Sequence, residues 1–418
     1  MRILYDCFSC SPYYGSDEGL GWMWPYKMSQ YHEVWVLIRK DRKEGIDRYC
    51  KENNIRGIHF VYCDLPDFMN IYYKRKAKNK NGTFDFLLYQ YLWQYVALPV
   101  AKKLHKKYRF DIVHHAVTND FRIIGRLDSL GIPFILGPIG GAQETPQALQ
   151  YYVRDHKKVE KVRSLLNRML TSTPGYRRTM QTASAVFVSN NETMEYILPI
   201  VRDEGKCQLL TELAIDDISG APEKVCKDNQ DDTVFIWAGR VEYRKGLELL
   251  MDVFRTLKDT DGWKLKICGT GSDFDHIKKL SADYEIDDRI EFLGFVEHSD
   301  LQVMFAEADA FVFPSLRETT GSVLLESMSV GLPVISLNQG GARQMIRPDE
   351  GYLIDVNSKD ECIAEFARVL KECIGNHEKL YQMGQRARTR ALKEYSWTSK
   401  CEYMNYVYKK AIAECNAD

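Results

Sequence analysis

Residues 310–337, AFVFPSLRETTGSVLLESMSVGLPVISL, decide the fold because they combine two buried strands, a turn and a short helix in one stretch. Residues 310–313 are an apolar run closed by a proline, and residues 333–337 are a second apolar run. Both are predicted to be parallel strands of a buried sheet. Between them, Ser322 is predicted to cap a short helix that ends at Gly331.

The turn before this helix is predicted to be an anion site, formed by Thr320, Gly321 and Ser322. The free N–H groups and the positive end of the helix dipole lie beside the strand ends, and Gly321 lets a phosphate approach the backbone closely. Glu318 precedes the turn and could reach a sugar, while Glu326 in the second helical turn could hold a ribose diol. Taken alone, the pattern favours ordinary surface residues at both positions, because glutamate is common in loops and on surface helices.

The stretch PSLRETTGSVLLESMSVGLPVI resembles the signature of retaining glycosyltransferases of family 4, in which two glutamates are separated by seven residues and followed by Gly-x-Pro-Val. Further motifs agree in the same order along the chain: Ala238-Gly239-Arg240 with Arg244-Lys245-Gly246, ICGTG at 267–271, RIEFLGFV at 289–296, and Gly340-Gly341. Thr320 replaces an aromatic residue that many members carry, and Gln344 replaces a glutamate. Both departures concern the identity of the donor sugar.

The resemblance implies the GT-B fold, an α/β architecture of two Rossmann-like domains with doubly wound parallel sheets facing a central cleft. A chain of 418 residues is long enough for two such domains. We expect an acceptor-side domain at 1–212 and a nucleotide-sugar-binding domain at 213–396. A final helix at 397–418 is expected to cross back to the first domain. Residues 211–215 resemble the hinge of the family, and a polar run follows them.

The reaction implied by the resemblance releases a nucleoside diphosphate from a sugar. Negative charge then develops on the diphosphate oxygens, and cationic side chains are needed to stabilise it. Arg240 follows Gly239 at a predicted strand end, and Lys245 lies five residues further on. An arginine fork and a lysine point charge can therefore reach one diphosphate from a single loop. The nucleotide base is expected near Gly294 and Phe295.

The N-terminal half contributes a glycine-rich loop and two histidines. In family members the first loop approaches the donor phosphate and the acceptor, which assigns Gly15 and Ser16 to the site. The family often has a histidine on the strand that reads DIVHHA here, beside the donor sugar. Strand alternation sends His114 and His115 to opposite faces, and we favour His115 narrowly. A buried histidine on such a strand is otherwise a structural residue.

Composition and charge exclude several classes of protein. The formal net charge is −1, which argues against a nucleic-acid binder, and no apolar run is long enough for a membrane span. The chain starts directly with a strand-like run, so we expect a cytoplasmic protein without a signal peptide. Cys7 and Cys10 form an isolated pair that could bind zinc only with a second pair. The basic clusters at 72–80 and 154–168 are either solvated helix faces or a surface for an anionic membrane.

We therefore predict an enzyme that transfers a sugar, with retention, from a nucleotide-sugar donor to a glycan or lipid-linked acceptor. We expect no cofactor and no metal, because helix capping explains Asp273 and Asp275 better than metal binding does. One alternative is a catalytically silent nucleotide-binding partner. Two others, a sugar phosphorylase and a nicotinamide dehydrogenase, lack a recognisable pyridoxal-phosphate lysine and a full Gly-x-Gly-x-x-Gly motif.

Overall fold

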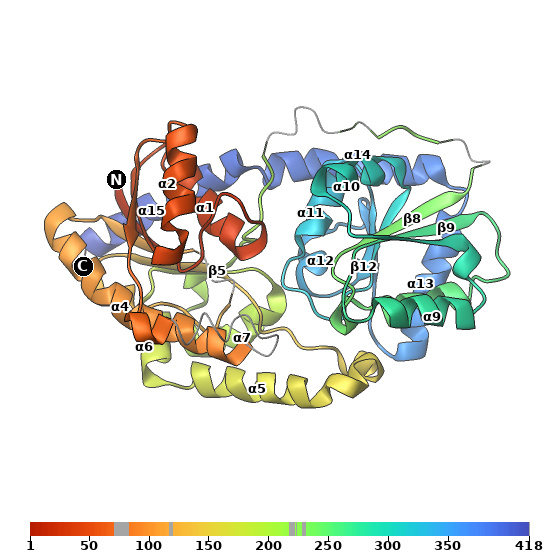
Figure 1. Cartoon of the computed structure of the whole chain (residues 1–418), viewed down its shortest axis with the longest axis horizontal. Helices are drawn as coiled ribbons and strands as arrows, with labels where there is room; N and C mark the ends of the chain where they lie inside the picture. Colours follow the sequence, from red (N-terminus) through yellow and green to blue (C-terminus); the bar gives the residue numbers. More distant parts are fainter. Residues whose placement is uncertain (71–82, 117–119, 217–221, 223, 228–230, 418) are drawn as a thin grey trace. The chain divides into compact units, whose positions relative to one another are not determined.

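The structure is a computed structural model that describes residues 1–70, 83–116, 120–216, 222, 224–227 and 231–417 (Figure 1). The chain divides into two compact units. Unit 1 comprises Met1–Ala142, Ser164–Glu212 and Cys401–Asp418, and unit 2 comprises Gln143–Arg163 and Leu213–Lys400. The predicted basic cluster at 72–80 lies outside the described residues.

Unit 1 is built on a parallel sheet in the order β3-β2-β1-β4-β5-β6-β7. Its strands are β1 Arg2–Asp6, β2 Glu33–Ile38, β3 Ile58–Tyr62, β4 Ile112–His115, β5 Phe134–Ile139, β6 Ala185–Val188 and β7 Cys207–Leu209. Its α-helices are α1 Ser16–Met28, α2 Lys43–Glu52, α4 Thr83–Tyr108, α6 Pro174–Thr182 and α7 Asn191–Val201. Short 3-10 helices lie at Lys40–Arg42, Leu127–Leu130 and Glu204–Lys206.

Unit 2 has a second parallel sheet, in the order β10-β9-β8-β11-β12-β13. Its strands are β8 Thr233–Ala238, β9 Trp263–Cys268, β10 Ile290–Gly294, β11 Ala310–Phe313, β12 Val334–Leu337 and β13 Gly351–Ile354. Its α-helices are α8 Leu247–Arg255, α9 Phe274–Asp283, α10 His298–Glu307, α11 Ser322–Ser329, α12 Gly340–Met345, α13 Lys359–Cys373 and α14 His377–Glu394. Its 3-10 helices are Gln147–His156, Tyr243–Lys245 and Asp287–Arg289. Two helices, α5 Lys157–Thr171 and α15 Trp397–Ala417, begin in unit 2 and end in unit 1.

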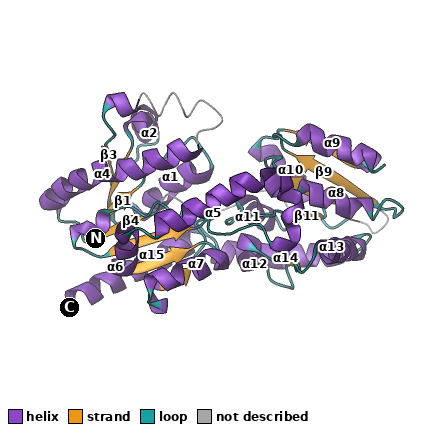
Figure 2. Ribbon diagram, turned by 90° about the horizontal axis from the view of Figure 1, so that it is seen from below, coloured by secondary structure: helices purple, strands orange, loops and turns teal. Residues whose placement is uncertain are grey.

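Strand alternation explains why helices cover both faces of the unit 2 sheet. On β8, Phe235 and Trp237 join the apolar core formed with α8, α9 and α13, while Ile236 and Ala238 join the core formed with α11 and α14. Figure 1 accordingly shows α9 and α13 on one side of this sheet and α10 and α14 on the other, and Figure 2 shows the unit from below. The predicted doubly wound α/β arrangement is confirmed.

The predicted strand at 310–313 coincides with β11, and the predicted strand at 333–337 contains β12. Two edge strands were not predicted, namely β7 with three residues and β13 with four. Edge strands are only half covered, so they lack the continuous apolar run that identifies a central parallel strand.

Residues 143–163 were expected in the N-terminal domain, and they pack in unit 2 instead. Leu149, Tyr152 and Val153 are buried in the same apolar core as α8. The hydroxyl of Tyr152 donates a hydrogen bond of 2.6 Å to Asp252 on that helix. Apolar burial and this partly buried hydrogen bond account for the placement.

The end of α15 packs in unit 1, where the hydroxyls of Tyr408 and Tyr5 lie 2.7 Å apart. Both side chains are completely buried. The C-terminal segment therefore completes the core of the unit that contains the N-terminus, as the resemblance predicts for the last helix.

Candidate active site

The site of unit 2 lies where the chain reverses its direction of travel across the sheet. The strands β8, β9 and β10 follow one another outward, and the chain then returns to place β11 on the other side of β8. In open α/β sheets, ligands bind outside the carboxyl ends of the strands at such a switch point. The loops after β8 and β11 therefore define the candidate site.

Backbone contacts hold these two loops together. The N–H of Leu316 donates a hydrogen bond of 2.9 Å to the carbonyl of Arg244. Gly246 has a φ of 73°, and a Cβ there would lie 2.0 Å from the carbonyl oxygen of Pro314. Only glycine fits both the backbone angle and the close approach. Gly246 thus allows the loop that contains Arg244 and Lys245 to pack against the backbone of Pro314.

Charged side chains of alternating sign fill the space between the two loops. Glu242 lies 3.0 Å from both Arg240 and Arg244, measured between nitrogen and carboxylate oxygen. Glu318 forms an ion pair with Lys245, and its carboxylate lies 3.9 Å from Arg244. Three cations share two carboxylates, so the cluster carries an excess of one positive charge. The predicted residues Arg240, Lys245 and Glu318 therefore meet in one network.

The three cations differ in exposure. The Arg240 side chain is 71% exposed, whereas that of Lys245 is 12% exposed. Burial lowers the pKa of Lys245, and the opposite charge of Glu318 counteracts that effect. A half-buried lysine beside an exposed arginine can bind an anion on two sides. Arg244 and Glu242 complete the network although neither was predicted as a site residue, and their proximity to Arg240 and Lys245 in the sequence was the available signal.

The turn before α11 differs in one detail from the prediction. The N-cap of α11 is Gly321, which has a left-handed backbone conformation, and no side chain caps the helix. Ser322 is the first helical residue and is exposed. The prediction that Ser322 caps the helix is therefore wrong, because glycine takes up the positive φ that the turn requires. The amino end of α11 remains without a side-chain cap, which suits an anion site.

The paired glycines bring α12 against this turn. A Cβ at Gly340 would lie 2.4 Å from the carbonyl oxygen of Glu318. A Cβ at Gly341 would lie 2.2 Å from the carbonyl oxygen of Thr320. Thr320 is 1% exposed, so its side chain belongs to the packing under the turn. The absence of side chains at Gly340 and Gly341 therefore allows α12 to pack closely against the backbone of the turn.

A second part of the site lies at the end of β10. The N–H of Gly269 donates a hydrogen bond of 2.6 Å to the carbonyl of Gly294, and the N–H of Gly239 donates one of 3.0 Å to Cys268. These bonds align the loops after β8, β9 and β10. Phe295 follows with 72% of its side chain exposed. An exposed ring next to the strand ends is a suitable platform for a flat base.

Glu326 lies beside the start of α10. Its carboxylate is 3.5 Å from the Nε2 atom of His298, and the carboxylate raises the pKa of that histidine through a hydrogen bond. Glu326 therefore lies close to His298, three residues beyond Phe295 along the chain. His298 was missed, because nothing in its sequence spacing connects it with Glu326.

The two histidines of unit 1 lie on opposite sides of β4, as strand alternation predicts, and both are buried. The Nε2–H of His114 donates to the carbonyl of Gly137 at 2.7 Å, and its Nδ1 accepts from the hydroxyl of Tyr408 at 2.5 Å. Burial lowers the pKa of His114 to about 3. This ring is neutral and structural.

His115 has different neighbours. Its Nδ1 lies 2.8 Å from the carboxylate of Asp6, and its Nε2 lies 3.1 Å from the carbonyl of Ile123. The carboxylate of Asp6 on β1 and the carbonyl of Ile123 therefore hold the ring from two sides. Through Ile123, the ring fixes the segment that follows β4. His115 is therefore placed as a positioning residue for that segment.

Gly15 and Ser16 lie at the amino end of α1, where Gly15 is the N-cap. Gly15 is exposed, and a Cβ there would meet no atom within 4 Å. Asp273 is the N-cap of α9, but its side chain makes no capping bond and accepts instead from the Ser272 hydroxyl at 2.8 Å. The expected capping by Asp273 is wrong, because the neighbouring hydroxyl occupies its carboxylate.

Comparisons with known proteins show which family the second half of the chain resembles. Residues 223–390, which contain the whole cation network and the turn before α11, match the family model described as Glycosyl transferases group 1. An uncharacterized glycosyltransferase of Methanocaldococcus jannaschii is 29% identical over 183 residues, which is 44% of this chain and 46% of that protein. The gpi3 subunit of phosphatidylinositol N-acetylglucosaminyltransferase of Schizosaccharomyces pombe is 28% identical over 46% of this chain and 41% of the subunit. The matches therefore span less than half of these relatives.

A solved structure resembles the whole chain. HepE of Anabaena in complex with UDP has a TM-score of 0.63 and 16% identity, and the match covers 98% of this chain and 100% of that one. At this identity the likeness shows the fold alone. The predicted GT-B fold, with two Rossmann-like parallel-sheet domains, is confirmed.

Proposed function

We propose that this protein is a retaining glycosyltransferase of family 4 that transfers a sugar from a nucleotide-sugar donor to a glycan or lipid-linked acceptor. One observation carries the proposal: the network of Arg240, Lys245 and Arg244 with its two glutamates at the switch point of the unit 2 sheet. The match of residues 223–390 to the group 1 family model supports it. The reaction is of a kind used in the synthesis of surface polysaccharides and glycoconjugates.

The cation network suits departure of a nucleoside diphosphate. As the bond to the anomeric carbon breaks, negative charge grows on the diphosphate oxygens. Exposed Arg240 offers a planar fork, and the half-buried Lys245 offers a point charge that water screens little. Preorganised donors of this kind contribute about 3 kcal/mol each to stabilising a transition state. Because cations and the amino end of α11 supply this stabilisation, we propose that the enzyme requires no metal.

Glu318 and Glu326 would have separate roles. Glu318 reaches the cation network from the turn before α11 and can accept a hydrogen bond from a sugar hydroxyl. Glu326 would accept both hydroxyls of the ribose, with Phe295 beside the base. The complex of HepE with UDP gives a precedent for a uridine nucleotide in this fold.

A nucleotide-sugar panel tests the proposal. Purified protein is incubated with UDP-, GDP- and other nucleotide sugars, and both thermal shift and release of the nucleoside diphosphate are measured. Turnover of at least one donor is expected, and NMR of the product anomer tests retention. Binding of a nucleotide without turnover of any donor, also in the presence of glycan acceptors, would favour the catalytically silent partner instead.

We further propose that the enzyme contacts an anionic membrane through α5. In the part of the chain that the structure describes, no helix is both long and apolar enough to cross a bilayer. On α5, the side chains of Val159, Val162, Leu165 and Met169 are 60%, 57%, 58% and 59% exposed. Lys158, Lys161 and Arg168 are exposed on the same helix. An exposed apolar stripe among cations is typical of a helix that lies in the membrane interface.

Sedimentation with vesicles tests this contact. Binding to vesicles with anionic lipid is expected at low salt, because each cation contributes about 1 kcal/mol near such a surface. The binding should weaken at high salt, because salt screens this attraction. Changing both Leu165 and Met169 to serine should weaken it further. The matched control changes Val303 to serine, which is 46% exposed on α10 of unit 2. Equal sedimentation of all three proteins at both salt concentrations would contradict the contact.

A further inference from the structure

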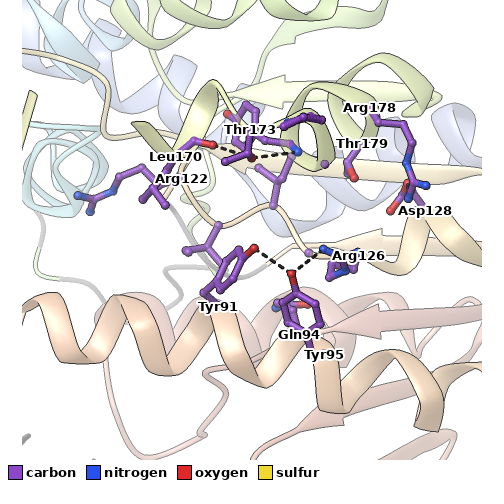
Figure 3. Close-up of a pocket in the computed structure, with 16 residues that line it drawn as sticks. Tyr91, Gln94, Tyr95, Arg122, Arg126, Asp128, Leu170, Thr173, Arg178 and Thr179 are labelled. Carbon is purple, nitrogen blue, oxygen red and sulfur yellow. Dashed lines mark hydrogen bonds and ion pairs between the residues drawn. The ribbon is translucent and has the colours of Figure 1, made fainter. Parts of the chain in front are cut away.

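A cavity of about 480 Å³ lies within unit 1 and has no role in the site described above. Its walls come from α4, from residues 122–128 after β4, and from residues 170–179 around the start of α6 (Figure 3). This volume falls in the range of small-molecule sites and exceeds the space that a single sugar ring needs.

The cavity wall contains buried polar atoms without a partner. Gln94 is 2% exposed, and neither its amide nitrogen nor its amide oxygen is hydrogen-bonded to any described residue. The same holds for the Nε atom of Arg126 and the Oδ1 atom of Asp128. Buried polar groups in folded proteins nearly always have partners, so four such atoms around one cavity need an explanation. Two of them donate and two accept, which matches a ligand with several hydroxyl groups.

The charges of the cavity leave one cation in excess. Arg122 forms an ion pair with Asp120 at 2.5 Å, and Arg178 forms one with Asp128 at 3.0 Å. Arg126 has no carboxylate partner among the described residues, and its guanidinium instead lies 4.4 Å from the ring centre of Tyr95. An anionic ligand in the cavity would give Arg126 the charged partner that the protein does not supply.

Two aromatic side chains form one wall. Tyr91 and Tyr95 lie one turn apart on α4, their hydroxyls are 2.9 Å apart, and the Tyr95 hydroxyl accepts a hydrogen bond of 3.1 Å from Arg126. Figure 3 shows these three side chains joined in a chain along the cavity. The tyrosine rings are 40% and 46% exposed. Exposed rings whose polar ends are already bonded leave apolar surface for the flat side of a sugar ring.

The cavity also reaches the segment that His115 fixes. Gly125 lines it, and a Cβ at Gly125 would lie 2.8 Å from Asp6 and 2.9 Å from His115. A ligand in the cavity would therefore contact the segment that follows β4 at its carboxyl end. Ligands of open α/β sheets are found at this end of the strands.

We propose that this cavity binds an acidic sugar, that is, a sugar ring with a carboxylate or phosphate group, as part of the acceptor. Arg126 would pair with the acidic group, Gln94 and Asp128 would bond the hydroxyls, and Tyr91 with Tyr95 would pack on the ring. The assignment to the acceptor rests on the proposed glycosyl transfer. The binding itself does not depend on it.

Calorimetric titration of the full-length protein tests the cavity with three probes: cellobiose, cellobiouronic acid and phosphorylated cellobiose. The wild-type protein should bind at least one acidic probe about tenfold more tightly than cellobiose, the effect of one charge-assisted hydrogen bond. The two acidic probes distinguish a carboxylate from a phosphate. Equal binding of all three, or no binding, would overturn the proposal.

Three variants locate the binding. Arg126→Gln should remove the preference for the acidic probe, and Gln94→Leu should weaken acidic and neutral probes by a similar factor of about five, the effect of one lost hydrogen bond. Arg177→Gln, on α6 but outside the cavity, is the matched control and should bind as the wild type does. If Arg126→Gln does not fold, the Gln94→Leu variant still tests the proposal. Unchanged affinity of Gln94→Leu for the acidic probe would contradict it.

Donor hydrolysis by the wild-type protein separates this inference from the proposed function. Hydrolysis of a nucleotide sugar without binding of an acidic probe would contradict the proposed sugar site in the cavity. The proposed glycosyltransferase activity would still stand. Binding of the acidic probe, removed by the variants, in a protein that turns over no donor would leave the cavity as a sugar site and contradict the transferase.

Discussion

The strand ends of the two units carry polar groups in opposite environments. In unit 2, Arg240 after β8 pairs with Glu242 at the surface, and the Arg240 side chain is largely exposed. In unit 1, His114 and His115 at the end of β4 are buried, and the protein itself bonds both nitrogens of each ring. A surface ion pair can exchange partners when an anion arrives, whereas a buried, saturated ring cannot without a large cost. The first region therefore suits ligand binding and the second suits stability.

The largest effect on activity is expected for Lys245→Ala, which tests the role of the unit 2 cations. Turnover of the donor should fall by about a hundredfold or more, because one preorganised cation at the diphosphate is lost. The melting temperature should change little, since Glu318 keeps Arg244 as a neighbour. Initial rates at saturating donor and a thermal scan give both values.

Lys258→Ala is the matched control, since this lysine of unit 2 is exposed and pairs only with Glu285 among the described residues. Its turnover should equal that of the wild type. Unchanged turnover in Lys245→Ala, with Arg240→Ala also unchanged, would remove the diphosphate assignment.

The next effect concerns stability and pH in unit 1. The folded pKa of His114 is lowered to about 3, below the ordinary value of about 6.5, so below pH 6.5 the unfolded chain binds a proton that the folded chain does not. Stability should therefore fall as the pH decreases, by about 1.4 kcal/mol per pH unit from this residue. Urea unfolding of the wild type and of His114→Asn between pH 7 and pH 5 should show a steeper fall in the wild type. Parallel curves would mean that His114 does not titrate as a buried neutral ring.

A smaller effect is expected for Glu326→Ala. The nucleoside diphosphate should bind about tenfold more weakly, with a smaller change in turnover, because a ribose contact persists from the ground state to the transition state. Titration of UDP and GDP by calorimetry measures the change, and Glu307→Ala on the exposed side of α10 is the control. A loss of turnover with unchanged nucleotide affinity would move Glu326 from the ribose to the reacting sugar.

The smallest effect is expected from a chelator. Activity in EDTA should stay close to that of the untreated enzyme, because the cation network and the amino end of α11 supply the positive charge. Complete loss that magnesium restores would contradict this expectation and direct attention to Asp273 and Asp275.

Features that depend on neighbours along the chain could be predicted from the amino-acid sequence alone. In residues 310–337 the two apolar runs, the turn and the helix end follow from local strand, turn and glycine preferences, and β11, α11 and β12 occur there. Arg240, Lys245, Glu318 and Glu326 could be chosen because short motifs fix their distance from strand ends. The placement of His114 and His115 on opposite faces followed from strand alternation.

Contacts between residues far apart in the chain could be identified only in the folded structure. Residues 143–163 pack in unit 2 because Tyr152 is buried in the apolar core of that unit. Its hydroxyl also donates a hydrogen bond to Asp252, about one hundred residues further along the chain. His114 is neutral because burial lowers its pKa, and the hydroxyl of Tyr408, from the opposite end of the chain, donates a hydrogen bond to its Nδ1 atom. The amide of Gln94, which has no hydrogen-bond partner among the described residues, likewise becomes visible only once α4 is packed. Burial and hydrogen-bond partners depend on contacts between remote residues, and the local pattern of the sequence does not contain them.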